Sequence, residues 1–460
     1  MLMGIIVTLT VFYGNVANLW WMFDDTQHLK LVALTELKVF TKPAAEVGYI
    51  PANFTPWLFL NYWIDLKLFG LDPRGAHIHQ LLSLGFTVAA AFYLLKRIMM
   101  PVIAIGTLVV FFLTPVAHTV IHILCTRHYL EGLGYACLGL AFYLKYRNSN
   151  RYAHLILAVI FSFIAFLNKE VYLPLVGIVT CISFFDFVET KSRRKLIPIG
   201  FFTSAAFVYF CYRAYALGWQ NLITGYGSAI DHRGPIEITI YLKEIIIFNQ
   251  LGILIALLLI SFLVYASRKL KEGIEIYSQF KFLTLNALAL VCILAPIYKV
   301  MPTANINHNY IFLATFSLVV ATGYFVSKLF ENPPFFKPKA QFISVFSVFL
   351  AMIFLQIFIT LPNATLNIQN NTSNLYDKHK VEGVYLLYSK DPVSHTLADA
   401  AGAPWHQSGL IDLRAQYLRL PPGPSVCTEV CRCANNGTVY RYNNGKLVEI
   451  NRSELKCNQE

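Results

Sequence analysis

Charged residues are scarce in this chain. Lys, Arg, Asp and Glu make up only 13% of its 460 residues, whereas 56% of the residues are hydrophobic. A soluble protein of this length needs far more polar surface to face water, so the composition excludes a soluble globular class. The sequence indicates a polytopic membrane protein instead. Its 36 Phe and 26 Tyr residues fit a helical bundle with aromatic belts at the membrane interfaces.

Three further features are missing from the sequence. The first hydrophobic run has no basic n-region and no small-residue cleavage site, which argues against a cleavable signal peptide. There is no clear internal repeat and no cluster of charge at mid-membrane, which disfavours a flippase. The net charge is +12, but the tail from Pro362 carries 10 basic and 9 acidic residues. The basic excess therefore lies in short membrane loops, and no nucleic-acid partner is predicted.

Long apolar runs are what the chain does have. They predict about eleven spans, near 3–22, 76–95, 100–117, 129–145, 152–168, 171–188, 196–217, 240–265, 280–298, 309–327 and 341–361. Basic residues such as those in KSRRK (191–195) and RKLK (268–271) fall in alternate loops, which the positive-inside rule makes cytoplasmic. We therefore predict an all-α membrane domain over 1–361 and an extracytoplasmic domain over 362–460, either α+β or irregular.

Two outer segments add detail to this topology. The loop 23–75 contains the stretch PWLFLNYWIDLKLFG (56–70), which is too short and too charged to span and favours a helix lying on the interface. The tail has a cluster of four cysteines, and an even number outside the cytoplasm predicts two disulfides, although zinc is an alternative. These residues are Cys427, Cys431, Cys433 and Cys457.

Polar residues gather at the predicted outer ends of the spans, where charge is costly unless it is paired or functional. Asp24 and Asp25 follow the first span, and they either end a helix at the headgroups or serve as acid-base groups. His118 and His122 are spaced to share one helical face, but no HExxH-type glutamate lies between them to favour a metal site. Lys169 and Glu170 form either a local ion pair or part of a site. Together, these carboxylates and cations suit an enzyme that acts on a phosphate-bearing lipid.

Five segments in chain order resemble the GT-C fold integral-membrane glycosyltransferases, most closely the protein O-mannosyltransferase branch that uses dolichyl- or undecaprenyl-phosphate sugars. FDD (23–25) is similar to the acidic pair of that family's first outer loop. The other segments are NFTPWLFLNYWIDLKLFGLDPRGAHIHQLLSL (53–84), PVAHTVIHILCTRHYLEGL (115–133), NKEVYLPL (168–175) and NHNYIFLATFSLVVATG (307–323).

This resemblance implies an inverting transfer of a sugar from a polyprenyl-phosphate donor to an acceptor hydroxyl. Asp24 would be the general base, and Asp25 would orient the acceptor or the base. Cations would hold the phosphate of the leaving group. The residues implied for the phosphate are Arg127 and Lys169 first, His118 and His128 second, and then His308, which stands where the family has arginine, or Lys299 in its place. Glu170 and His77 are assigned to the acceptor side or to the loops.

The expected partners are the polyprenyl-phosphate sugar donor, an acceptor protein or glycan, and membrane lipids. No metal or other cofactor is predicted. The expected location is the bacterial inner membrane with a periplasmic catalytic face, or the endoplasmic reticulum in a eukaryote. The alternatives are a lipid-linked oligosaccharide flippase, an O-antigen polymerase-type enzyme and an inactive membrane scaffold.

Overall fold

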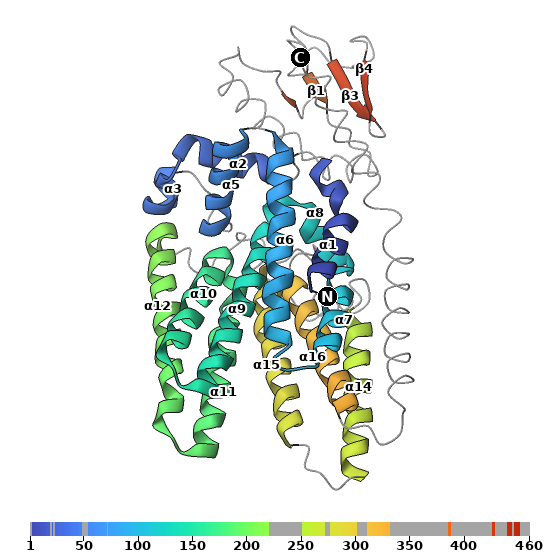
Figure 1. Ribbon diagram of the computed structural model, residues 1–460. Helices are drawn as coiled ribbons and strands as arrows, with labels where there is room; N and C mark the ends of the chain where they lie inside the picture. Colours follow the sequence, from blue (N-terminus) through green and yellow to red (C-terminus); the bar gives the residue numbers. More distant parts are fainter. Residues whose placement is uncertain are drawn as a thin grey trace.

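The chain forms a bundle of helices (Figure 1). The computed structural model describes residues 2–18, 21, 24–47, 54–70, 72–219, 251–271, 277–300 and 311–331, and four short strands between 385 and 450. The helices are α1 (Leu2–Phe12), α2 (Asp25–Thr35), α3 (Lys38–Thr41), α4 (Ala44–Val47), α5 (Pro56–Phe69), α6 (Pro73–Leu95), α7 (Pro101–Phe112), α8 (Pro115–His122), α9 (Arg127–Ser149), α10 (Tyr152–Asn168), α11 (Pro174–Thr190), α12 (Ile197–Leu217), α14 (Leu251–Lys271), α15 (Tyr277–Val300) and α16 (Phe312–Glu331).

Proline marks the start of many of these helices. It occupies one of the first two positions of α5, α6, α7, α8, α11 and α12, where its fixed φ suits a helix and its missing N–H is not needed. Asp72 caps α6 by accepting a hydrogen bond from the Arg74 amide, and Thr114 caps α8 by accepting one from the Ala117 amide. Local sequence therefore sets where these helices begin.

Four helices in the described part are long and apolar enough to cross a membrane: Pro73–Leu95, Glu170–Thr190, Arg193–Leu217 and Phe312–Phe330. A fifth span results if α7 and the helix Val116–His122 are taken as one segment, bent by 69°. Large apolar side chains such as Ile160, Phe207 and Leu263 are exposed on α10, α12 and α14, as expected for helices that face lipid. These features describe a helical membrane protein, and eleven spans remain a prediction.

Two predicted segments coincide with helices. The segment predicted at 152–168 is α10 (Tyr152–Asn168), which is shorter than the spanning helices, and the span predicted at 196–217 is α12 (Ile197–Leu217), part of the spanning helix Arg193–Leu217. The first predicted span, 3–22, is wrong in length, because α1 ends at Phe12 and a 3-10 turn follows over Gly14–Asn18. Gly and Asn are weak helix formers, which accounts for this early end. The predicted span 341–361 lies outside the described residues.

A close contact between α9 and the turn before α11 fixes the position of Lys169 and Glu170. A Cβ on Gly132 would lie 2.2 Å from a ring carbon of Tyr172, so only glycine fits this position. The Tyr172 hydroxyl donates a hydrogen bond to the Tyr129 carbonyl, one turn earlier on α9. The turn is therefore attached to α9 by both packing and a hydrogen bond.

The predicted helix of the first outer loop is present as α5, which packs over one end of the bundle beside α2 (Figure 1). Its buried side is not purely apolar, since Asn61 and Asp65 are buried along with Phe59 and Tyr62. We call this end of the molecule the site end. It comprises α2, α5, the start of α9, the turn between α10 and α11, and the final turn of α12.

The tail contributes four short strands in the order β2-β1-β3-β4. These are β1 (Tyr385–Leu387), β2 (Val426–Cys427), β3 (Val439–Asn443) and β4 (Lys446–Ile450). Strand β1 is parallel to β2 and β3, whereas β3 and β4 are antiparallel. Of the cysteines predicted to form disulfides, Cys431, Cys433 and Cys457 lie outside the described residues, so the pairing stays a prediction.

The Gly132 contact leads to a stability prediction. Gly132→Val should lower the free energy of unfolding by about 1–3 kcal/mol, because the added methyl groups displace the Tyr172 ring. Gly177→Val on α11 is the control, since a Cβ there would meet nothing within 4 Å. Thermal unfolding in detergent measures both, and equal melting temperatures for the two variants would contradict the contact.

Candidate functional site

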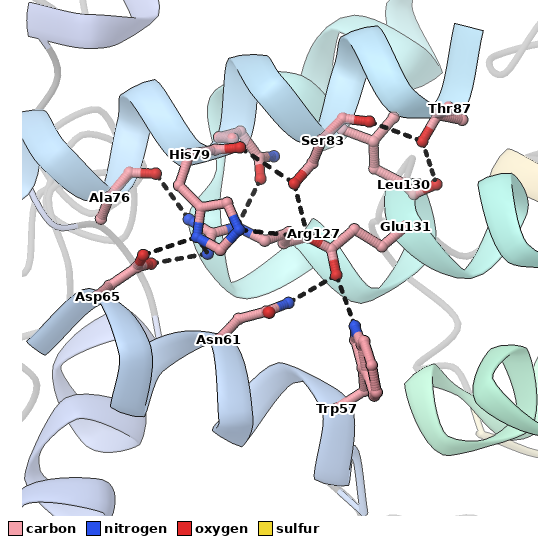
Figure 2. A network of polar contacts seen from close by, with 11 residues as sticks. Trp57, Asn61, Asp65, Ala76, His79, Ser83, Thr87, Arg127, Leu130 and Glu131 are labelled. Carbon is pink, nitrogen blue, oxygen red and sulfur yellow. Dashed lines mark hydrogen bonds and ion pairs between the residues drawn. The ribbon is translucent and has the colours of Figure 1, made fainter. Parts of the chain in front are cut away.

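A buried polar network joins α5, α6 and α9 (Figure 2). Arg127 lies at its centre with 1% of its surface exposed. Its NH1 donates to Asp65 Oδ2 at 2.7 Å, its Nε to Gln80 Oε1 at 2.9 Å, and its NH2 to the Ala76 carbonyl at 2.7 Å. All three guanidinium nitrogens are thus bound to neighbouring parts of the protein.

The Glu131 carboxylate, one turn further along α9, forms the second centre of this network. It accepts hydrogen bonds from Asn61 at 2.6 Å, Trp57 at 2.9 Å and Ser83 at 2.6 Å. His79 lies between the two centres, with Nδ1 2.7 Å from Asp65 Oδ1. Since Trp57, Asn61 and Asp65 recur every four residues on α5, one face of that helix is held to the bundle over its central turns.

Opposite charges stabilise the ionised form of Asp65. Burial alone would raise the pKa of this carboxyl group, but the adjacent Arg127 guanidinium and the hydrogen bond from His79 hold its pKa below the ordinary value. The Asp65 carboxylate therefore stays charged and paired with Arg127 near neutral pH.

The predicted acidic pair lies next to α5, and its two members have different surroundings. Asp25 is fully buried and accepts a hydrogen bond of 2.7 Å from the Tyr62 hydroxyl. Asp24 is partly exposed and precedes the first turn of α2. Of the two carboxylates, Asp24 is thus the one with greater access to a substrate.

His28 connects this pair to the rest of the site. Its Nδ1 is 2.6 Å from the Asp24 carbonyl oxygen, so Nδ1 carries a proton and donates, while Nε2 is left as the acceptor of the neutral ring. The ring is stacked on Tyr62, with centroids 5.4 Å apart. Burial lowers the pKa of His28; the charge of Asp24 opposes this, and that of Lys169 adds to it. Asp24 and Lys169 therefore both lie within electrostatic range of one imidazole.

Two residues at the junction of α8 and α9 complete this side. Burial raises the pKa of the Cys125 thiol, and the charges of Asp25 and Asp24 raise it further, so the thiol stays protonated. His128 is buried within electrostatic range of Lys169 and His28. The backbone of Cys125 lies close to the imidazole of His128 and favours its charged form.

The turn between α10 and α11 supplies the positive charge. Lys169 is buried, and its Nζ lies 3.8 Å from Glu170 Oε1. Arg213, in the last turns of α12, lies 3.3 Å from Glu170 Oε2 and sits over the Phe54 ring. A carboxylate with two buried cations therefore adjoins the aspartate pair.

The other predicted site residues are placed elsewhere or cannot be placed. The ring of His118 is stacked on His122 at 3.9 Å and also contacts Tyr13, and His77 is fully buried in the first turn of α6. Lys299 belongs to the last turn of α15, and His308 lies outside the described residues. Among the described residues, no group of three or more His, Cys, Asp or Glu side chains could hold a metal.

Sequence reasoning missed His28, Tyr62 and Arg213. His28 had a detectable signal, because it lies four residues after Asp24 and so returns to the same face of a helix. Tyr62 and Arg213 had none, since the partner of each lies far away in the chain, 37 positions for Tyr62 and 43 for Arg213.

Comparisons with known proteins do not decide the family. No family model matches the chain, and no curated protein matches it. One solved structure that matches is an oligosaccharyltransferase from Archaeoglobus fulgidus, tethered through a disulfide to an acceptor peptide containing the NVT sequon. The match has 12% identity and a TM-score of 0.44, and covers 91% of this chain and 68% of that one. It is too distant to assign a function.

The buried network leads to a second stability prediction. Arg127→Met should lower the free energy of unfolding by about 3–5 kcal/mol, because it leaves the Asp65 carboxylate buried without a counter-charge. The double variant Arg127→Met/Asp65→Leu should recover part of that loss. Lys67→Met, at an ion pair whose side chains are 53% and 64% exposed, is the control and should lose less. Chemical denaturation of the four proteins measures this, and equal losses at Arg127 and Lys67 would contradict it.

Proposed function

We propose that this chain is an inverting glycosyltransferase that moves a sugar from a polyprenyl-phosphate donor to an acceptor hydroxyl. The observation that carries the proposal is the convergence at the site end. The partly exposed Asp24 and the buried Lys169 are 145 residues apart in the chain, yet both lie within electrostatic range of His28, whose Nδ1 donates to the Asp24 carbonyl at 2.6 Å. A base and a cation placed together are what transfer from a phosphate leaving group requires.

Each group has a defined task in the reaction. Asp24 accepts the proton of the acceptor hydroxyl as that oxygen attacks the anomeric carbon. The bond between this carbon and the phosphate oxygen breaks, and the phosphate leaves with the electron pair. Lys169 and His128 stabilise the negative charge on the phosphate. Asp25, held by Tyr62, positions the segment that carries Asp24.

Arg127 has a structural task in this proposal. The resemblance assigned it to the phosphate, but its guanidinium is already bound to Asp65, Gln80 and Ala76. A phosphate would have to displace Asp65 from a buried ion pair, which is unfavourable. We therefore assign Arg127 to holding α5 in place, and the phosphate to Lys169 in the turn after α10.

An apolar cavity of about 600 Å³ supports a lipid-linked donor. It begins at Val171 and Tyr172, directly after Lys169 and Glu170, and runs between α9, α11, α15 and α16. On α9 it extends from Leu133 to Arg147, which is about 21 Å of helix at 1.5 Å per residue. That length is roughly two-thirds of the hydrocarbon thickness of a bilayer. A polyprenyl chain fits this position if its phosphate binds at Lys169.

The general base gives the main functional test. Asp24→Asn should lower the rate of sugar transfer by about a hundred- to ten-thousandfold while donor binding is retained, because the amide cannot accept the proton. The assay follows transfer of a radiolabelled sugar from membrane donors. Glu36→Gln, an exposed carboxylate in the same outer loop, is the control and should keep full activity. Full activity of Asp24→Asn would refute the proposal.

The cavity gives a second test. Ala136→Phe and Ala289→Phe place a ring in the cavity from opposite walls and should raise the KM for a long-chain donor about tenfold. The KM for a donor with a short prenyl chain should change little. Leu263→Phe, on the exposed face of α14, is the control. An equal effect on both donors would mean that the polyprenyl chain does not bind in this cavity.

A further inference from the structure

Glu170 is shared by two cations without a close bond to either. Its two carboxylate oxygens lie 3.8 Å from Lys169 Nζ and 3.3 Å from Arg213 NH1. Charge-assisted hydrogen bonds between nitrogen and oxygen usually measure about 2.7–2.9 Å. The Arg127–Asp65 pair in the same protein reaches 2.7 Å. The contacts of Glu170 are therefore loose by the standard of this structure.

Within ion-pair distance, two cations share one carboxylate. The side chains of Lys169 and Arg213 are 5% and 7% exposed, whereas that of Glu170 is 35% exposed. Within the described part of the chain, no other carboxylate lies within ion-pair distance of either cation. Two buried positive charges facing one half-exposed negative charge favour the binding of a further or stronger anion.

Within the described residues, some N–H groups of the Arg213 guanidinium make no hydrogen bond. Only its NH1 makes hydrogen bonds in the described structure, to Glu170 and to the Tyr209 hydroxyl, both at 3.3 Å. The Phe54 ring, 5.5 Å from the guanidinium carbon, restrains the plane of the group. A restrained guanidinium with unused N–H groups suits the tetrahedral oxygens of a phosphate.

We propose that the Glu170 carboxylate occupies the place of the donor's phosphate, and that the phosphate displaces it to bind between Lys169 and Arg213. The inference rests on the proposed function, which supplies the phosphate-bearing lipid. The donor's phosphodiester carries one negative charge, as a carboxylate does, and the phosphate gains a second charge as the sugar leaves, so the two cations bind it most strongly in the transition state and in the product. Glu170, on a 3-10 turn and partly exposed, can swing outward. Arg213 thereby becomes a donor-binding residue, and Glu170 an internal competitor that weakens binding and speeds release of the product phosphate.

Binding of farnesyl phosphate to the purified full-length protein tests this, with farnesol as the uncharged control. Calorimetry in detergent measures both affinities. Arg213→Gln should weaken farnesyl phosphate binding by about ten- to a hundredfold, the range for loss of a charged hydrogen-bond donor. Arg213→Lys keeps the charge but loses the planar set of guanidinium N–H donors. Its affinity should lie between those of Arg213→Gln and the natural protein. Glu170→Gln should tighten binding by about two- to fivefold, because it removes the competing charge.

The exposed Lys67–Glu36 pair on the outer loop supplies matched controls. Lys67→Gln and Glu36→Gln remove the same charges from an ion pair of 3.1 Å outside the site, and should leave the affinity unchanged. If Glu170→Gln weakens binding as Arg213→Gln does, Glu170 is a structural partner and the inference is overturned. Unchanged affinity in Arg213→Gln overturns it as well.

The transfer assay separates this inference from the proposed function. If the natural protein binds farnesol as tightly as farnesyl phosphate and transfers no sugar, both fail. If transfer depends on Asp24 but Arg213 and Glu170 leave the affinity unchanged, only the displacement of Glu170 is wrong.

Discussion

The buried ion pair between Arg127 and Asp65 is the constraint on which the site end depends. It joins α9 to α5 in a place with almost no solvent, and such a pair is tolerated only when its remaining hydrogen-bonding groups are satisfied. Gln80, Ala76 and His79 meet that requirement. With α5 held in this way, Tyr62 is placed to bind Asp25 and to stack on His28. The position of the acidic pair thus follows from a contact that contains neither aspartate.

A second feature of the site is that its carboxylate and its cations come from different segments of the chain. The accessible carboxylate comes from the start of α2, and the cations come from the turn after α10 and from the end of α12. His28 is buried within electrostatic range of Asp24 and Lys169, and His128 within range of Lys169 and His28. A base and an anion-binding group that come from different segments can act on two parts of one substrate.

Much of the local structure was predictable, because it depends on short-range signals. Prolines mark the starts of α6 and α11, and the apolar runs end where α10 and α12 end. The early end of α1 was missed, because hydrophobicity continues past Gly14 although helix propensity does not. The segment 56–70 was correctly predicted to be helical, but its buried polar residues were not, since their partners lie on α6 and α9.

By itself, the sequence determined that this is a helical membrane protein, where most of its described helices begin, and that Asp24 and Lys169 are unusual charges at helix ends. Composition and short-range patterns carry that information. Only the tertiary structure decided which charges are already paired. Arg127 and Lys169 look alike in sequence, as basic residues beside an apolar run, yet Arg127 is closed in by Asp65 while Lys169 faces a loosely held carboxylate. Asp65 lies 62 positions before Arg127, and Arg213, which shares Glu170 with Lys169, lies 43 positions after Glu170, so no local pattern contains either contact.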